Sequence, residues 1–213
     1  MPAVYTPPSG DLEIIYADDS LLVVNKPAGL LAVPGRGADK QDCLASRIQI
    51  DFPDALVVHR LDMATSGLMV FARGIEMQRR LSQIFRERGV EKRYVAVVSG
   101  QLALEAGEIN LPIAADWPNR PRHKIDLAAG KHSLTRYLSL GYVNGNTRVE
   151  LEPFTGRTHQ LRLHMSAIGH PILGDALYGD AASASRLLLH AHALRFAHPL
   201  IGEPLNFVCD PLF

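Results

Sequence analysis

Short β-rich runs recur along this chain, and they do not alternate regularly with helical patterns. The runs at 12–16 and 21–25 flank a four-residue polar turn, which predicts a hairpin. The runs at 134–142 and 148–152 predict a second hairpin around Asn144-Gly145-Asn146. Strand runs that are not separated by helices at regular intervals favour an α+β fold with a mostly antiparallel sheet.

Two segments show a helical period. Residues 75–88 place apolar side chains at i, i+4, i+7 and i+8 from Met77, and Gly89 ends the pattern. The second helix is expected after Thr158 as N-cap, with Gly169 as its stop. The remaining assignments are a short helix at 44–50, strands at 68–72, 93–98, 187–189, 193–197 and 205–208, a short apolar run at 109–113, and a loop over 116–133.

Composition excludes several classes of protein. The 22 basic and 22 acidic residues cancel, so net charge alone gives no argument for a polyanionic partner. Cys43 and Cys209 are not in a CxxC pair, which argues against a zinc or redox motif. No signal-peptide pattern and no apolar run of about 20 residues is found, so a cytoplasmic protein is expected. The first ten residues contain three prolines and are expected to form a loose arm.

One stretch places charge where burial is expected. Residues 57–71 read VVHRLDMATSGLMVF, with a charged cluster between two apolar runs. A buried aspartate is costly unless it is paired. Asp62 is therefore either compensated by a partner or present for its chemistry.

Common catalytic motifs are missing from the sequence. It contains no GxxxxGK[ST], no GxGxxG after a strand and no GxSxG. His190 and His192 alternate along an expected strand, but no carboxylate lies at a spacing that completes a metal site. We expect no metal and no cofactor, and a metal-dependent hydrolase using these two histidines is the minor alternative.

Basic residues are concentrated in two places. In the 73–93 stretch, a solvated helix face with ion pairs and a polyanion-binding face remain equal alternatives. In the loop over 116–133, two prolines stiffen a tryptophan beside arginines, a combination that can stack on bases. RNA binding is the interpretation preferred for this loop, through Trp117, Arg120, Arg122 and Lys124.

Several motifs occur together in the order of one family. HRLDMATSGL at 59–68, KRY at 92–94 and GRTHQLR at 156–162 resemble the three signatures of the RluA-type pseudouridine synthases. VNKPAG at 24–29 and GHPILGD at 169–175 are similar to that family as well. The resemblance implies a pseudouridine synthase fold, with residues 1–213 forming a single catalytic domain of two halves around one cleft and no N-terminal S4-type domain.

The resemblance also implies a substrate. The chain is most similar to family members that modify both a 23S rRNA hairpin and a tRNA anticodon stem-loop. RNA is thus the expected partner of a monomeric enzyme that isomerises uridine to pseudouridine without a cofactor. A noncatalytic RNA-binding module, such as a ribosome assembly factor on the same fold, is the alternative.

By the same resemblance, Asp62 is the catalytic carboxylate, which must be ionised whether it attacks the base, attacks the sugar or removes a sugar proton. Burial favours the neutral carboxyl group, and Arg162 is expected to oppose this as the partner of Asp62. The alternative is that Asp62 and Arg162 form a buried ion pair with a structural role only. The other implied residues are Tyr94 against the target uracil, Leu161 beneath the site, Arg60 in the place of the flipped base, His59 in contact with RNA or in a structural hydrogen bond, Arg36 and Arg157 on RNA, and Thr65, Ser66 and Gly67 in the turn that holds Asp62.

Overall fold

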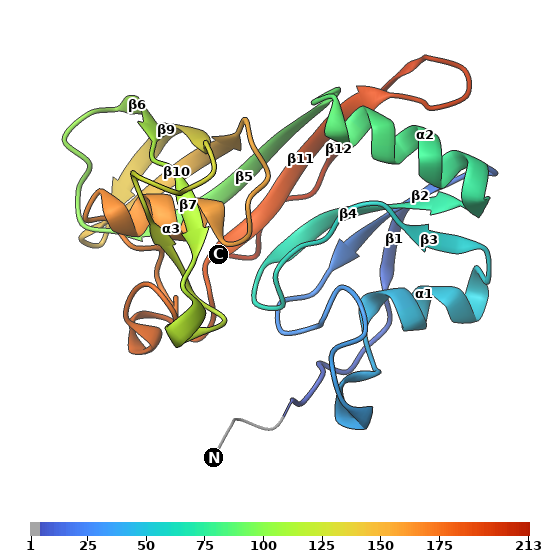
Figure 1. Cartoon of the computed structure of the whole chain (residues 1–213), viewed down its shortest axis with the longest axis horizontal. Helices are drawn as coiled ribbons and strands as arrows, with labels where there is room; N and C mark the ends of the chain where they lie inside the picture. Colours follow the sequence, from blue (N-terminus) through green and yellow to red (C-terminus); the bar gives the residue numbers. More distant parts are fainter. Residues whose placement is uncertain (1–4) are drawn as a thin grey trace. The chain divides into compact units, whose positions relative to one another are not determined.

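The computed structural model describes residues 5–213, which divide into two compact units. Unit 1 consists of the described residues up to Glu91 together with Ala191–Pro211, and unit 2 consists of Lys92–His190 with Leu212–Phe213. The chain passes between the units within two strands, β5 (Val90–Ser99) and β11 (Leu189–Ala197), and again after Pro211 (Figure 1). The described part of the chain forms twelve strands and three α-helices, which confirms the α+β class.

Unit 1 is built on an antiparallel sheet. β1 (Glu13–Ala17), β2 (Leu21–Lys26) and β4 (Ser66–Arg73) lie side by side, followed by β11. The short strand β3 (Ala55–Val57) pairs with β4, and β12 (Pro204–Val208) pairs with β11. β1 and β2 form the predicted hairpin, so that assignment is confirmed.

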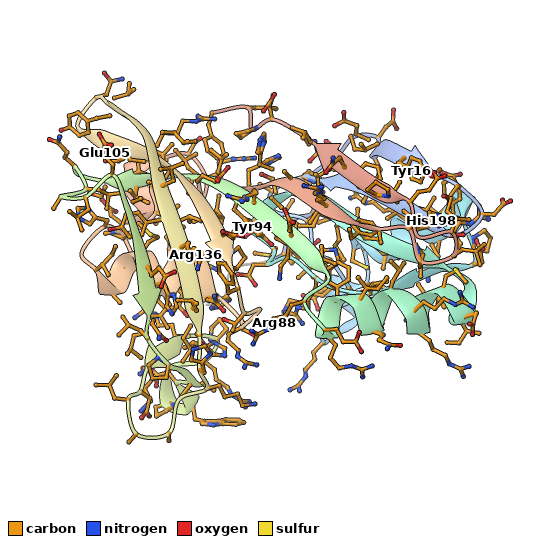
Figure 2. All side chains as sticks on the ribbon, turned by 90° about the horizontal axis from the view of Figure 1, so that it is seen from above. Tyr16, Arg88, Tyr94, Glu105, Arg136 and His198 are labelled. Atoms are coloured by element: carbon orange, nitrogen blue, oxygen red, sulfur yellow. The ribbon has the colours of Figure 1, made fainter. Side chains whose placement is uncertain are left out.

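The β1–β2 turn is fixed by one carboxylate. Asp18 Oδ1 accepts hydrogen bonds from the backbone N–H groups of Ser20 and Leu21, at 2.7 and 2.8 Å. Its Oδ2 lies 2.6 Å from the Tyr16 hydroxyl and 3.0 Å from His198 Nε2. Figure 2 labels Tyr16 and His198. The turn is thereby tied to the segment that connects β11 to β12.

The unit 1 sheet is buried on both faces. Because side chains alternate along a strand, Leu22 and Phe71 point to one face, where they pack with the helix α1 (Leu44–Asp51). Leu21 and Val70 point to the other face and pack with α2 (Gly74–Arg86). Figure 1 shows the two helices on opposite sides of β2 and β4.

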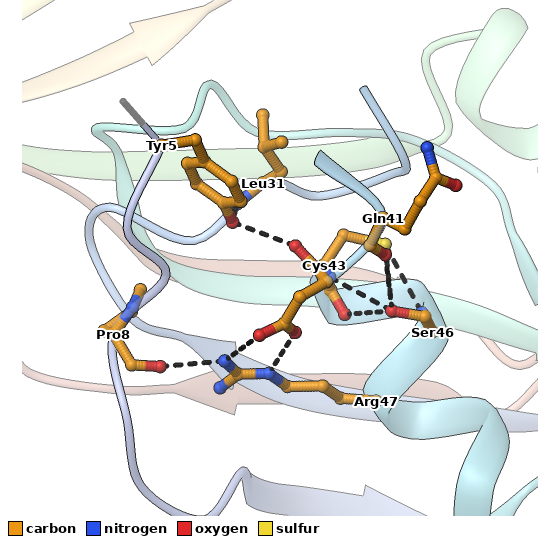
Figure 3. A network of polar contacts seen from close by, with 8 residues as sticks. Tyr5, Pro8, Leu31, Gln41, Cys43, Ser46 and Arg47 are labelled. Atoms are coloured by element: carbon orange, nitrogen blue, oxygen red, sulfur yellow. Dashed lines mark hydrogen bonds and ion pairs between the residues drawn. The ribbon is translucent and has the colours of Figure 1, made fainter. Parts of the chain in front are cut away.

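The N-terminal arm is held against α1 in its described part, so the expectation of a loose arm is wrong for residues 5–10. The Tyr5 hydroxyl donates to the Asp42 carbonyl, at 3.0 Å, and accepts from the Leu31 N–H. Arg47 of α1 donates to the Pro8 carbonyl at 2.9 Å and also pairs with the Asp42 carboxylate (Figure 3). Residues 1–4 lie outside the described residues.

Unit 2 contains a second antiparallel arrangement, with the strand order β5, β10 (Asn146–Pro153), β9 (Leu134–Val143) and β6 (Ala106–Asn110). β9 and β10 form the second predicted hairpin. The expected run at 109–113 is split between β6 and β7 (Ile113–Ala115), because Pro112 lacks the N–H that continuous pairing needs.

The assignment of 116–133 as a plain loop is wrong. Residues Trp117–Asn119 form a 3-10 helix, and β8 (His123–Ile125) pairs with β7 in a separate two-stranded ribbon. We call Ile113–Ile125 the β7–β8 hairpin. A three-residue strand is too short to show a period of two, so the sequence pattern did not reveal it.

The helix α3 (Gln160–Ala167) packs against β8, β9 and β10. Its N-cap is His159, with φ 56° in the left-handed region, so the prediction of Thr158 as N-cap is wrong. Among the described residues no side chain caps the first turn of this helix, and the Gln160 Oε1 instead accepts from the N–H of Arg157, before the helix, at 3.1 Å. The expected strand at 193–197 lies within β11, whereas the one expected at 187–189 shares only Leu189 with it. None of the helices in the described part has the length and apolar character that crossing a membrane requires.

Candidate active site

Asp62 lies on a tight turn between β3 and β4. The Thr65 N–H donates to the Asp62 carbonyl at 3.1 Å, which closes the turn. Asp62 is half-buried, Leu61 before it is buried and Met63 after it is exposed. The turn therefore holds a carboxylate at the border between the core of unit 1 and solvent.

Lys26 holds the Asp62 turn through a hydrogen bond to the backbone of the turn. It is fully buried at the end of β2, and its Nζ donates to the carbonyls of Pro27, Leu30 and Met63, at 2.9, 2.7 and 3.0 Å. The Gly29 N–H also donates to the Met63 carbonyl, at 2.8 Å. The residue next to Asp62 is thus fixed to the β2 end of the sheet.

Sequence reasoning gave Lys26 no role at this site. The available signal was a lysine that directly follows an apolar strand and precedes Pro-Ala-Gly. Lysine is almost never fully buried unless it is paired.

His59 makes the structural hydrogen bond that the sequence left open. Its Nε2 accepts from the Val70 N–H at 3.0 Å, and its ring stacks on Phe85 of α2 at 4.4 Å. The accepting Nε2 must be unprotonated, so this ring is held in one tautomer. Arg60, the next residue, is exposed.

Of the three residues expected in the Asp62 turn, Thr65 closes it with its backbone N–H. Ser66 and Gly67 are the first residues of β4. Gly67 has φ +113°, and a Cβ there would lie 2.4 Å from the Ala191 carbonyl oxygen. Glycine at this position permits the close approach of β4 to β11.

In unit 2, Arg162 on α3 pairs with Asp175. Its Nε donates to Oδ2 and its Nη2 to Oδ1, both at 2.7 Å. Asp175 Oδ1 also accepts from the N–H groups of Leu177 and Tyr178. Burial of Asp175 acts to raise its pKa, but these hydrogen bonds and the charge of Arg162 outweigh it and hold the pKa below the usual range.

The pairing of Arg162 with Asp175 was not foreseen from the sequence, which named Asp62 as the partner of Arg162. The signal was the similarity of the GHPILGD segment to the family, because Asp175 is its last residue.

Gln160, the first residue of α3, fixes the helix that carries Arg162. Its Oε1 accepts from the Thr155 hydroxyl at 2.7 Å, and its Nε2 donates to the Leu134 carbonyl and the Thr135 hydroxyl. A buried amide satisfied in this way has one orientation, so α3 cannot slide along β9 without breaking these bonds.

The other expected residues of unit 2 are also placed. Leu161 is buried at 6% exposure. Tyr94, labelled in Figure 2, is half-buried on β5. It lies opposite Leu151 of β10.

Apart from half-buried His59, the residues expected to bind RNA are exposed. In the β7–β8 hairpin, the Arg120 guanidinium lies 3.4 Å from the centre of the Trp117 ring. Lys124 pairs with Asp126 at 3.1 Å. The remaining members of the set are Arg36 in unit 1 and Arg122 and Arg157 in unit 2.

Residues 5–213 contain no group of three histidines, cysteines or acids arranged to hold a metal ion. His192 Nδ1 instead lies 3.1 Å from the Cys209 carbonyl oxygen.

Three comparisons with known proteins bear on this site. A family model described as RNA pseudouridylate synthase matches residues 20–167. Dual-specificity RNA pseudouridine synthase RluA of Yersinia pestis is 50% identical over 204 residues, covering 94% of this chain and 99% of the relative. The protein of the same name from Escherichia coli K12 is 50% identical over 208 residues, covering 95% of each chain.

Solved structures with a similar fold carry the same family name. The solved structure of human RNA Pseudouridylate Synthase Domain Containing 1 matches with a TM-score of 0.79 at 30% identity, covering 97% of this chain and 86% of the human chain. The structure of human RNA Pseudouridylate Synthase Domain Containing 4 matches with a TM-score of 0.75 at 28% identity, covering 93% and 88%.

Proposed function

We propose that this chain, which belongs to the RNA pseudouridylate synthase family, uses Asp62 to isomerise uridines in a 23S rRNA hairpin and in tRNA anticodon stem-loops. The chain is an RNA pseudouridine synthase. The residues that carry the reaction and the RNAs that are modified are what we propose. The observation that carries it is the 50% identity, over nearly the full length of both chains, to relatives named as dual-specificity enzymes. The proposed enzyme is a cytoplasmic monomer whose chain acts as one catalytic domain.

The reaction moves one bond within the nucleoside. The N1 glycosidic bond breaks, the uracil turns, and C5 bonds to the ribose carbon while the C5 proton is lost and N1 gains one. Asp62 performs its step as the ionised carboxylate, whether it attacks the base, attacks the sugar or removes a sugar proton. The bonds from Lys26 and Gly29 to the Met63 carbonyl support this role, because a held turn presents the carboxylate in one position.

The target base must leave its stack to reach a half-buried carboxylate. Extrusion of a base costs a few kcal/mol, which contacts with the protein must offset. Arg60 is exposed two residues before Asp62, and we assign it to the space that the base vacates. Tyr94 lies against the extruded uracil, Leu161 packs beneath it, and Arg162 stabilises the ionised form of Asp62.

RNA outside the target base is held by exposed cations and one aromatic ring. Trp117, Arg120, Arg122 and Lys124 all belong to the β7–β8 hairpin, and Arg157 precedes α3. Arginine contacts to phosphate supply affinity that falls with salt, and a tryptophan face stacks on bases of any sequence. Such contacts suit an enzyme that accepts two different stem-loops. Arg36 of unit 1 completes the set.

The test is site-resolved mapping of pseudouridine in total RNA from cells that lack this gene, complemented with the wild type or with Asp62→Ala. We expect loss at one 23S rRNA site and in the anticodon stem-loops of some tRNAs, restored by the wild type only. RNA binding by purified Asp62→Ala should stay close to that of the wild type, because the substitution removes a reacting group and no phosphate contact.

Other outcomes have defined meanings. Loss at a single RNA site would overturn the dual specificity and keep the chemistry. Restoration by Asp62→Ala would remove Asp62 from its catalytic role. If no site changes, the noncatalytic RNA-binding alternative is favoured.

A further inference from the structure

The Tyr178 hydroxyl connects two segments that are far apart in the sequence. It accepts a hydrogen bond from the backbone N–H of His123, at 2.8 Å, on β8. It also lies 2.8 Å from Nδ1 of His159, the N-cap of α3. Because the hydroxyl already accepts from His123, it can donate its own proton to His159 Nδ1.

The same tyrosine is tied to Arg162. Its backbone N–H donates to Asp175 Oδ1 at 3.1 Å, the oxygen that also accepts from Arg162 Nη2. Its ring lies under the guanidinium, with the central carbon of Arg162 5.4 Å from the ring centre. A displacement of the Tyr178 ring therefore changes the surroundings of Arg162 directly.

The backbone of His123 is what Tyr178 holds on the β7–β8 hairpin. The His123 ring meets the His159 ring edge-on at 5.5 Å, but its Nδ1 is buried without a hydrogen-bond partner. The hydrogen bond from the His123 N–H to Tyr178 is thus a directional polar link between this strand and the segment that follows α3. The hairpin carries Trp117, Arg120, Arg122 and Lys124. A displacement of the hairpin by bound RNA would therefore move the hydrogen-bonded Tyr178 hydroxyl.

We propose that Tyr178 is a positioning residue that couples the seating of RNA on the β7–β8 hairpin to the orientation of Arg162. This inference rests on the proposed function, because it takes Arg162 as a group that acts on Asp62 and the hairpin as an RNA contact. The hydroxyl of Tyr178 holds the hairpin in register with α3, and its backbone and ring hold the Asp175–Arg162 pair. RNA bound to the hairpin thereby favours the reactive arrangement of Arg162.

Tyr178→Phe tests the coupling, because it keeps the ring and removes both hydroxyl bonds. We expect the single-turnover rate at saturating RNA to fall by about 10- to 100-fold, the loss typical of a small misplacement of a catalytic group. The matched control is Tyr142→Phe, which removes the hydroxyl of an exposed tyrosine on β9 and should leave the rate unchanged. A lower melting temperature with a wild-type rate at saturating RNA would show a merely structural role and overturn the proposal.

A second pair of variants keeps the test valid if Tyr178→Phe folds poorly. Asn and Gly both accept the left-handed backbone of His159, but only Asn can accept the hydrogen bond from Tyr178. We expect His159→Asn to keep most of the rate and His159→Gly to lose it. Equal rates for both would overturn the role of this bond.

Coupling itself is measured by a double-mutant cycle with Arg122→Ala. If the hairpin acts through Tyr178, the kcat/KM of the double variant should fall by less than the product of the two single losses, whereas independent effects multiply. An Asp62→Ala variant in the same assay reports on the proposed function separately. Its inactivity, together with a normal rate for Tyr178→Phe, would overturn the coupling alone.

Discussion

Arg162 donates from Nε and Nη2 to the two carboxylate oxygens of Asp175, and both hydrogen bonds are 2.7 Å long. The two side chains are 6% and 0% exposed. Two parallel charge-assisted bonds fix the plane of a guanidinium as well as its position. Asp175 therefore sets the orientation of the Arg162 guanidinium. The backbone N–H groups of Leu177 and Tyr178 in turn hold the Asp175 carboxylate in place.

Arg162→Ala should destabilise the protein by about 3–5 kcal/mol, because it leaves the buried carboxylate of Asp175 without its cation. Urea unfolding at pH 7 measures the change in the free energy of unfolding. Arg157→Ala, at an exposed position five residues earlier, should change it by less than about 0.5 kcal/mol. Similar losses in the two variants would contradict a buried pair.

The contribution of Asp175 to the free energy of unfolding should decrease at acidic pH. Its pKa is lower in the folded than in the unfolded protein, so its stabilisation is present above the unfolded value of about 3.9 and is lost as pH falls through the folded value. Asp175→Asn should thus be less stable than the wild type at pH 7, and the difference should narrow below about pH 4. Unfolding curves from pH 7 to pH 3 test this, with exposed Asp11→Asn as the control. A constant difference over this range would contradict the assignment.

Gly67→Ala should be strongly destabilising, because the new Cβ would meet the backbone of Ala191. Gly10 offers a close control: its φ is +114° against +113° for Gly67, but no atom lies within 4 Å of its Cβ position. Gly10→Ala therefore reports the cost of the backbone conformation alone. We expect Gly67→Ala to lose about 1–3 kcal/mol more, the usual range for overpacking, by thermal or urea unfolding. Equal losses would mean that β4 and β11 can separate without cost.

Lys26→Met should lower the free energy of unfolding by at least about 2 kcal/mol, because three carbonyl oxygens lose their shared donor. It should also slow isomerisation at saturating RNA, since the Met63 carbonyl helps to hold the Asp62 turn. Lys40→Met is the control, because the Lys40 side chain is 42% exposed and its ammonium lies 3.9 Å from Asp39. A wild-type rate in a folded Lys26→Met variant would show that the hydrogen bonds of Lys26 are not needed for isomerisation.

The double substitution of Arg120 and Arg122 by alanine should weaken RNA binding and make it less sensitive to salt. Each lost phosphate contact lowers the slope of log K against log salt by about 0.7 to 0.9. Arg136→Ala is the control within unit 2, because Arg136 is exposed and already pairs with Glu108 at 2.5 Å. Slopes equal to that of the wild type would exclude the β7–β8 hairpin from the RNA interface.

The sequence determined most of the regular structure. Both hairpins, the helix α2 and the buried strand β4 follow from local periods and turn residues, and these act over a few positions along the chain. The three family signatures likewise identified the enzyme class, because each is a contiguous stretch of residues. Where the local signal is short or misleading, as in β8 and at the Thr158 position, the prediction was wrong.

Only the tertiary structure decided which side chains support the site. Lys26 and Met63 are 37 residues apart, Arg162 and Asp175 are 13 apart, and Tyr178 and His123 are 55 apart. No period or turn rule links such positions, since their contacts arise when separate strands and helices pack. The identity of the reacting carboxylate could be inferred from a motif, whereas the hydrogen bonds that orient its neighbours depend on the folded arrangement of distant segments.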